Sequence, residues 1–258
     1  MVDEVVSRLL EAEYNRTPID PITTKYPDMM IDDAYKIQLR LIEEKKKRGE
    51  IVVGKKVGLT SKAMQELAGI DEPDYGFLTD RMVVFEGFPI KLSELIHPRV
   101  EAEIVFVLKE DLEGPGVLVS DVLRATDYIM PALEIIDSRI KRDKRRRIED
   151  SISDNAGTGR VVFSGKMSSI TDMDLRRVGL IFEKNGDVIS TAAGAAVLGN
   201  PAQAVAWLAN KLSRYGVTLH EREIILSGSL IAAIDVGPGD SVTAIFDRIG
   251  SVKAKFVE

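Results

Sequence analysis

The stretch His97–Leu108, His-Pro-Arg-Val-Glu-Ala-Glu-Ile-Val-Phe-Val-Leu, carries the pattern that decides the fold prediction. Side chains alternate between the two faces of a β-strand, and the even-numbered residues from Val100 onward give a face that is entirely apolar. The opposite face carries Glu101 and Glu103 before two valines. The pattern predicts a strand buried on both faces, with two carboxylates side by side at a spacing of roughly 6–7 Å.

Two buried like charges are costly unless a cation or an arginine offsets them. A third acid, Glu134, lies in the equally apolar run Tyr128–Ile136. Three carboxylates offer hard oxygen ligands without nitrogen or sulfur, a donor set that suits Mg²⁺ or Mn²⁺. The alternative is that the glutamates form buried ion pairs with Arg99, Arg139 or a lysine, because structural ion pairs also occupy such positions. The pattern alone leaves both open.

The composition narrows the class of protein. The chain has 258 residues and a formal net charge of −6, which argues against nucleic-acid or anionic-membrane partners. The lack of cysteine excludes disulfides, thiolate catalysis and Cys-ligated zinc, and the presence of only two histidines argues against a Ser-His-Asp triad. No apolar run approaches the ~18–20 residues of a membrane span, and the acidic start is unlike a signal peptide. We expect a cytoplasmic small-molecule enzyme or oligomerising protein.

The order of the expected elements favours an α+β fold. Apolar spacing predicts helices over residues 2–14 and from Asp32 or Asp33 to Arg48, and strands dominate the rest of the chain. A short helix over residues 62–68 and a helix from Pro201 to Gly216 interrupt these strands. This order predicts an antiparallel or mixed sheet instead of a regular βαβ series.

The most basic run covers residues 139–147, Arg-Ile-Lys-Arg-Asp-Lys-Arg-Arg-Arg. It has no interleaved aromatic residues and belongs to an acidic chain. We therefore expect an exposed loop or a subunit contact in preference to a nucleic-acid site.

Three other positions have side chains suited to chemistry. Lys56 lies between Gly54 and Gly58 on a short predicted strand; a metal beside it would disfavour its ammonium form and poise it for proton transfer, the alternative being a surface lysine. Asp74, in a Pro-Asp-Tyr-Gly turn, is either a general acid or base or a local hydrogen-bond acceptor. The segment Ser227–Ser229 follows a strand and is a candidate carboxylate-binding loop, although a serine without a base is a poor nucleophile.

Long motifs across nearly the whole chain carry a family resemblance: Gly54–Gln65, Glu72–Gly76, Pro98–Glu103, Pro131–Arg139, Ser153–Ala156, Gly194–Pro201 and Val205–Asn210. They resemble the 2-oxopent-4-enoate (2-hydroxypenta-2,4-dienoate) hydratases, the 2-oxohept-4-ene-1,7-dioate hydratases and the 4-oxalocrotonate decarboxylases. The resemblance implies a mixed β-roll core of the fumarylacetoacetate hydrolase type with a helical N-terminal region. We place the N-terminal region at residues 1–80, packed on a catalytic core at residues 81–258.

The resemblance also implies roles for individual residues. Glu101, Glu103 and Glu134 would hold Mg²⁺ or Mn²⁺, and Lys56 and Asp74 would do the acid–base work. Substrate-binding positions correspond to Leu59, Ser227 and Ser229. The sequence departs from many relatives at Gly157, where they have a small hydroxyl residue thought to line the substrate site.

The implied activity is metal-dependent hydration of 2-hydroxypenta-2,4-dienoate to 4-hydroxy-2-oxopentanoate in the meta-cleavage catabolism of aromatic compounds. The alternative is a 4-oxalocrotonate decarboxylase that uses the same metal-stabilised enolate. A third hypothesis is a silent family member that associates with a partner pathway enzyme. The family likeness further implies a large homo-oligomer, and the basic loop at residues 139–147 would favour a diacid if it folded over the pocket.

Overall fold

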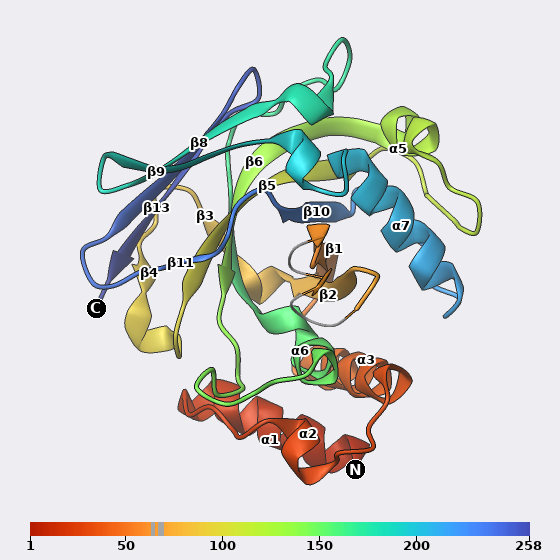
Figure 1. Ribbon diagram of the computed structural model, residues 1–258, viewed down its shortest axis with the longest axis vertical. Coiled ribbons are helices and arrows are strands. Elements are labelled where there is room, and N and C mark those ends of the chain that lie inside the picture. Colours follow the sequence, from red (N-terminus) through yellow and green to blue (C-terminus); the bar gives the residue numbers. More distant parts are fainter. Residues whose placement is uncertain (63–64, 67–69) are drawn as a thin grey trace.

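The computed structural model describes residues 1–62, 65–66 and 70–258, and it contains two β-sheets with helices around them (Figure 1). The larger sheet has eight strands in the order β2-β1-β10-β5-β6-β7-β3, with β11 paired to β5. Its strands are β1 Val52–Gly58, β2 Asp74–Thr79, β3 Val83–Phe85, β5 Arg99–Leu108, β6 Thr126–Ile136, β7 Thr158–Phe163, β10 Ile224–Ser229 and β11 Ile234–Asp235. The pairs β1–β10 and β3–β7 are parallel and the other pairs are antiparallel, so the predicted mixed sheet is confirmed.

The second sheet has five strands in the order β4-β13-β12-β8-β9. Its strands are β4 Ile90–Lys91, β8 Gly179–Lys184, β9 Asp187–Ala193, β12 Ser241–Phe246 and β13 Gly250–Val257. The β8–β9 hairpin turns at Asn185-Gly186, where both residues have positive φ angles of 57° and 90°. Asn-Gly adopts two successive positive φ angles more easily than most residue pairs, so the sequence predicts this hairpin.

The helices are α1 Val2–Asn15, α2 Ile22–Lys25, α3 Ile31–Lys47, α5 Val119–Ala125, α6 Ile148–Ser153 and α7 Pro201–Ser213, and the 3₁₀ turns are η1 Asp80–Met82, η2 Leu92–Glu94, η3 Asn155–Gly157, η4 Leu175–Arg177 and η5 Gly194–Ala196. The first three helices gather with α6 at one end of the molecule, and α7 lies beside β10 (Figure 1). The two long N-terminal helices match their predicted ranges within two residues. The short helix predicted over residues 62–68 falls partly on 63–64 and 67–69, outside the described residues.

Strand β5 is buried on both faces, as its sequence predicts. Val100, Ile104 and Phe106 belong to the main hydrophobic core, whereas Val105 and Val107 belong to a separate apolar cluster on the other face. Its neighbours on either side are β6 and β10, which place it in the interior of the sheet. The carboxylates of β5 are therefore carried by a strand that is held in the interior of the sheet and buried on both faces.

The first 80 residues contribute to both the helical region and the large sheet. Strand β1 pairs in parallel with β10, and Lys56 lies opposite Leu226. Strand β2 then pairs with β1 and forms the edge of the sheet. The division into residues 1–80 and 81–258 remains a prediction. Along the described parts of the chain, no helix combines the length and apolar composition needed to cross a membrane.

A buried ion pair fixes the segment after β6. Arg139 Nε lies 2.6 Å from Asp154 Oδ1, and Arg139 Nη1 donates to the carbonyls of Asp137 and Thr158 at 2.8 and 2.7 Å. The Ser138 hydroxyl donates to the other Asp154 oxygen at 2.8 Å. The expectation of an exposed basic loop therefore holds for residues 143–147 and is wrong for Arg139, because its guanidinium has a matched set of internal acceptors.

We expect Arg139→Met to lower the free energy of unfolding by about 3–5 kcal/mol, because the substitution leaves the Asp154 carboxylate buried without its cation. Urea unfolding followed by circular dichroism measures this loss. Arg176→Met is the matched control, since its ion pair with Asp174 is largely exposed and surface substitutions usually change stability by no more than about 0.5 kcal/mol. A loss no larger than that of the control would contradict the clamp role of Arg139.

Candidate active site

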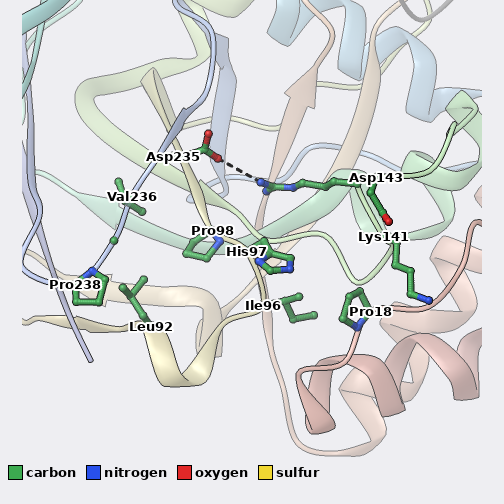
Figure 2. Close-up of a pocket in the computed structure, with 12 residues that line it drawn as sticks. Pro18, Leu92, Ile96, His97, Pro98, Lys141, Asp143, Asp235, Val236 and Pro238 are labelled. Atoms are coloured by element: carbon green, nitrogen blue, oxygen red, sulfur yellow. Dashed lines mark ion pairs between the residues drawn. The ribbon is translucent and has the colours of Figure 1, made fainter.

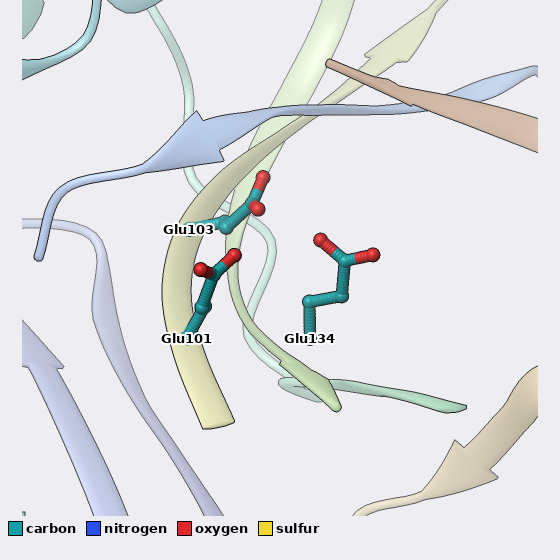
Figure 3. A group of neighbouring side chains, drawn as sticks. All are labelled: Glu101, Glu103 and Glu134. Atoms are coloured by element: carbon teal, nitrogen blue, oxygen red, sulfur yellow. The ribbon is translucent and has the colours of Figure 1, made fainter. Parts of the chain in front are cut away.

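Three glutamates from neighbouring strands converge on one point, as Figure 3 shows. Glu101 and Glu103 point from the same face of β5, and the antiparallel register of β5 and β6 places Glu134 opposite Glu101. One carboxylate oxygen of each residue lies within 4.8 Å of the others. Glu103 and Glu134 are buried, whereas Glu101 is partly exposed. Strand pairing thus brings together the three carboxylates that the sequence suggested as a metal site, a proximity that sequence alone could not show.

Each buried carboxylate has one oxygen fixed and one oxygen free. The backbone N–H of Gly228 donates to Glu103 Oε2 at 2.7 Å, and the Thr158 hydroxyl donates to Glu134 Oε1 at 2.8 Å. No donor among the described residues reaches Glu103 Oε1 or Glu134 Oε2. A buried polar atom without a partner costs about 1–3 kcal/mol, more when it is charged. Oriented, unpaired carboxylate oxygens fit a hard divalent cation such as Mg²⁺ or Mn²⁺.

The crowding of these acids changes their protonation. Burial raises the pKa of Glu101 to about 7, the nearby Glu134 carboxylate adds to this, and Lys56 and Arg99 oppose it. Burial, together with Glu134 and Glu101, also holds the pKa of Glu103 well above its usual value. The cluster by itself therefore retains protons near neutral pH. Metal ligands must be deprotonated, so cation binding here would release protons.

Lys56 joins the cluster from β1. Its Nζ lies 3.6 Å from Glu134 Oε1, and the side chain is buried. Burial lowers the pKa of Lys56, but Glu134, Asp74 and the two other glutamates raise it to a net value above the usual one. The sequence led us to expect that a metal would disfavour the ammonium form; the surrounding carboxylates favour it. Lys56 is therefore a buried cation and not a surface lysine.

Asp74 faces the same region from β2. The register of β1 and β2 pairs Asp74 with Gly58, and a Cβ at Gly58 would lie only 2.2 Å from Asp74 Oδ1 and 3.3 Å from Lys56 Nζ. A glycine is needed at position 58 because Asp74 and Lys56 occupy the space that any larger side chain there would require. Asp74 Oδ1 has no hydrogen-bond donor among the described residues, and Ser151 Oγ lies 3.4 Å from Oδ2. Burial raises the pKa of Asp74, Lys56 opposes this, and Glu134 adds to it.

A cavity of about 560 Å³ opens onto Glu101. Its walls are mostly apolar, with Arg99 and a few hydroxyl side chains among them; the lining residues are Gly58, Leu59, Thr60, Ser61, Arg99, Glu101, Ala196, Ser229, Leu230, Ile231, Ala232 and Ala233. A small acid with a short carbon chain fits this mixture of apolar wall and charged side chains.

The predicted substrate-binding residues divide into two groups. Leu59 and Ser229 line the cavity, and Leu59 has a positive φ of 55°, an unusual conformation for a residue with a side chain. Ser227 is fully buried and donates to the Ile104 carbonyl at 2.8 Å, so its hydroxyl is used within the sheet. Ser229 donates to the Ile231 carbonyl at 2.7 Å and shapes the loop that follows.

Three residues of the site have roles that the sequence reasoning did not assign, although Gly228 lies in the segment Ser227–Ser229 that is predicted to bind a carboxylate. Gly228 holds Glu103 through its backbone N–H, and a Cβ at this glycine would lie 2.5 Å from the Thr60 side chain. Thr158 holds Glu134 and directly follows Gly157, the position at which the sequence departs from its relatives. Arg99, considered only as an ion-pair partner for the glutamates, lines the cavity instead. One signal in the sequence pointed to this region: Gly157 replaces the small hydroxyl residue of many relatives, and it directly precedes Thr158, whose hydroxyl binds Glu134.

A second cavity of about 670 Å³ lies outside this cluster (Figure 2). Its walls include Pro18, His97 and Asp235, and the ion pair drawn there joins Asp235 to Arg142 at 3.6 Å. None of the candidate metal ligands, Lys56 or Asp74 lines it. The larger cavity is therefore separate from the chemistry of the three-carboxylate cluster.

We expect Glu103→Gln to weaken Mn²⁺ binding by more than about 100-fold, because loss of a ligand should exceed the 10–100-fold losses typical of residues that only orient ligands. Isothermal titration calorimetry on the full chain measures the affinity, and circular dichroism checks the fold. Glu110→Gln, an exposed glutamate beyond the end of β5, is the matched control and should bind Mn²⁺ as the unaltered chain does. Equal affinities for the two variants would refute the ligand assignment.

The stability of the metal-free protein should depend on the Glu101 carboxyl. Its pKa is about 7 in the folded chain and 4.5 ordinarily, so between these values the folded state binds the extra proton. Stability then falls as pH rises through this window. We expect Glu101→Gln, which cannot ionise, to gain stability relative to the unaltered chain from pH 4.5 to 7 in EDTA. Urea midpoints across this range measure the difference, and a constant difference would contradict the raised pKa.

Comparisons with known proteins agree with this geometry. The family described as "Fumarylacetoacetate (FAA) hydrolase C-terminal" matches residues 52–257. The 4-oxalocrotonate decarboxylase of Pseudomonas sp. (strain CF600) is 44% identical over 246 residues, covering 95% of this chain and 93% of that protein. The 2-hydroxypent-2,4-dienoate hydratase of Pseudomonas putida is 45% identical over 218 residues, covering 84% of this chain and 98% of that protein.

A solved structure is similar throughout the fold. The 4-oxalocrotonate decarboxylase from Pseudomonas putida G7, complexed with magnesium and adipate, has a TM-score of 0.96 and 41% identity, with 99% of this chain and 97% of that chain covered. The magnesium in that structure agrees with the divalent-metal cofactor expected here. The resemblance inferred from sequence motifs is confirmed. The chain belongs to the fumarylacetoacetate hydrolase family and is an enzyme of the lyase type.

Proposed function

We propose that this enzyme is a metal-dependent hydratase that adds water to 2-hydroxypenta-2,4-dienoate or a close homologue and forms a 4-hydroxy-2-oxo acid. One observation carries the proposal: a cluster of three carboxylates, two of them with an unpaired buried oxygen, lies beside a buried lysine, and its member Glu101 lines a cavity with mostly apolar walls. A 2-hydroxy-dienoate has the matching parts, namely two oxygens at one end and a short unsaturated chain. The hydratase relative supports this substrate class.

Glu101, Glu103 and Glu134 are the residues that would hold Mg²⁺ or Mn²⁺. When bound, such a cation supplies Lewis-acid stabilisation of the negative charge that develops on the substrate's 2-oxygen. Gly228 and Thr158 fix the two buried carboxylates, so the free oxygens keep their direction. Preorganised ligands of this kind need little rearrangement during the reaction.

Lys56 and Asp74 are the proposed proton carriers. The dienol must lose its 2-hydroxyl proton and gain a proton at C5 to become the unsaturated 2-oxo acid, and water then adds its hydroxyl at C4 and a proton at C3. Asp74, with a raised pKa, fits the group that accepts a proton, and the Lys56 ammonium fits the donor. Leu59 and the apolar wall would position the carbon chain and limit the water that enters.

A second candidate is decarboxylation of a 4-oxalocrotonate-type diacid. The specific observation in its favour is the similarity to the decarboxylase structure that holds magnesium and adipate, a six-carbon diacid. Loss of CO₂ from such a substrate generates the same enolate, so the three glutamates would serve either reaction. The choice between the two reactions depends on the groups around the chain of the substrate and not on the metal ligands.

Assembly and location complete the proposal. Phe85 and Phe88 are 74% and 66% exposed, and Val188 on β9 is 58% exposed; large exposed apolar side chains of this kind support a homo-oligomer. We also propose a cytoplasmic location and contact with a partner enzyme of the same pathway. A catalytically silent member that only scaffolds such a partner is the remaining alternative.

The deciding assay offers 2-hydroxypenta-2,4-dienoate and 4-oxalocrotonate separately, each with Mg²⁺ and with EDTA. We expect hydration of the dienoate that EDTA abolishes. Lys56→Met should lower kcat by about 10²–10⁴-fold, the usual contribution of a general acid or base. Lys255→Met, an exposed lysine on β13, is the matched control and should leave kcat unchanged.

The other outcomes discriminate among the alternatives. CO₂ release from 4-oxalocrotonate without hydration of the dienoate would replace the hydratase with the decarboxylase. Turnover of neither substrate by the Mg²⁺-loaded protein would favour the scaffold.

A further inference from the structure

Strand β2, which carries Asp74, lies at the edge of the large sheet and is held there by helix α3. The neighbouring strand β1 pairs with only one side of β2, so the backbone groups on the outer side need partners from elsewhere. Gln38 of α3 is fully buried, and its Nε2 donates to the carbonyl of Tyr75 at 2.7 Å. Tyr75 directly follows Asp74, so a helix side chain fixes the backbone next to the proposed proton carrier.

The same amide group of Gln38 also holds α6. Its Nε2 donates to the carbonyl of Ile152 at 3.1 Å, and Ile152 directly follows Ser151, whose Oγ lies 3.4 Å from Asp74 Oδ2. Both atoms that the amide nitrogen meets are carbonyl oxygens, and a glutamine NH₂ group has the two N–H donors that they require. Gln38 therefore joins the residue next to Asp74 to the residue next to its hydroxyl partner.

A second contact from α3 fixes Tyr75 through its ring. The rings of Tyr35 and Tyr75 are stacked, with their centroids 4.6 Å apart and their planes 12° from parallel. Tyr35 and Gln38 are three positions apart on α3, so both side chains leave the same face of the helix. Helix α3 thus holds Tyr75 by its carbonyl and by its ring, and a change at either contact would shift the residue next to Asp74.

Asn155 closes the edge of β2 two residues further on. Its Oδ1 accepts the backbone N–H of Phe77 at 2.8 Å, and its Nδ2 donates to the Phe77 carbonyl at 2.9 Å, as a neighbouring strand would. Asn155 lies three residues before Thr158, which holds Glu134, so a change there would also disturb a metal ligand. Among the described residues, the side chain of Gln38 hydrogen-bonds to none of the three glutamates. Gln38 is therefore the contact that bears on Asp74 separately from the metal cluster.

We propose that Gln38 is a positioning residue that sets the Asp74 carboxylate toward Lys56. This inference rests on the proposed function, because it takes Asp74 as a proton carrier. Asp74 Oδ1 has no hydrogen-bond donor among the described residues and the contact from Ser151 to Oδ2 is long, so the backbone of β2 determines where the carboxylate lies. Proton transfer needs its partners within hydrogen-bond reach, and a displacement of about 1 Å can lower the rate by about 100-fold.

The test uses Gln38→Met, which keeps the length of the side chain and removes both donors. With whichever of 2-hydroxypenta-2,4-dienoate and 4-oxalocrotonate the Mg²⁺-loaded chain turns over, we expect kcat to fall by about 10–100-fold. Mn²⁺ affinity, measured by isothermal titration calorimetry, should stay at the value of the unaltered chain, and circular dichroism checks the fold. If Gln38→Met does not fold, Gln38→Asn serves the same comparison, because its amide is one methylene too short to reach both carbonyls.

The variant Asp74→Asn separates positioning from a general loosening of the fold. Alone it should lower kcat by about 10²–10⁴-fold, the usual contribution of a general acid or base. Adding Gln38→Met should lower kcat no further, because the carboxylate that Gln38 positions is already gone, whereas independent effects would add. Leu41→Ala is the matched control: it loosens the packing of α3 at a buried position and removes no hydrogen bond, so kcat should stay unchanged.

Four results would overturn the inference while the proposed function stands. They are an unchanged kcat in the folded Gln38 variant, a parallel loss of Mn²⁺ affinity, a further loss of kcat in the Asp74→Asn background, and an equal loss of kcat in Leu41→Ala. Turnover of neither substrate by the unaltered Mg²⁺-loaded chain would overturn the proposed function and the inference with it. Full activity of Asp74→Asn would overturn the proposed role of Asp74, and with it the role of Gln38.

Discussion

The structure depends on the enclosure of three carboxylates between β5 and β6. Like charges at this spacing repel in a low-dielectric environment, and the strands hold them together because the rest of both strands is apolar and buried. The cost is offset in part by Lys56 and by the donors Gly228 and Thr158, and the free oxygens that remain are suited to a divalent cation. The unpaired carboxylate oxygens destabilise the metal-free fold at this point, but they remain available to bind a cation. Carboxylates fully paired with protein cations would bind a metal ion less well.

A second set of buried charges secures the frame around the cluster. Asp154 holds Arg139, and Asp150 accepts both the backbone N–H and the hydroxyl of Thr23, at 3.0 and 2.7 Å. The two Asp150 contacts join α6 to the N-terminal helical region across more than 100 residues of sequence. Because β7 begins at Thr158, four residues after Asp154, the same anchoring positions the hydroxyl that orients Glu134. The two sets of charges differ in their hydrogen bonding. Both carboxylate oxygens of Asp154 accept hydrogen bonds, whereas Glu103 and Glu134 each keep one oxygen without a donor among the described residues.

The candidate chemistry follows from this contrast between satisfied and unsatisfied groups. Lys56 and Asp74 come from the two strands at the edge of the large sheet, and the missing side chain of Gly58 lets them approach each other. Arg99 lines the same cavity as Glu101, two residues away on β5. Hydration and decarboxylation both need an electron sink and a proton carrier, and the proposed metal ligands together with Lys56 and Asp74 would supply both.

The sequence by itself determined the buried strand with its two glutamates, the mixed α+β class, the Asn-Gly hairpin and the family, because these rest on local periodicity, turn chemistry and long motifs. It also singled out Glu134, Lys56 and Asp74 from the residues around them, but left their roles open until the resemblance to relatives was considered. Tertiary structure decided what no local pattern contains: the β5–β6 register that sets Glu134 opposite Glu101, the use of Ser227 within the sheet, and the burial of Arg139 in an otherwise exposed basic run. The physical reason is that burial and pairing are properties of groups brought together from distant positions, and a side chain's chemistry changes with the charges and donors that folding places around it.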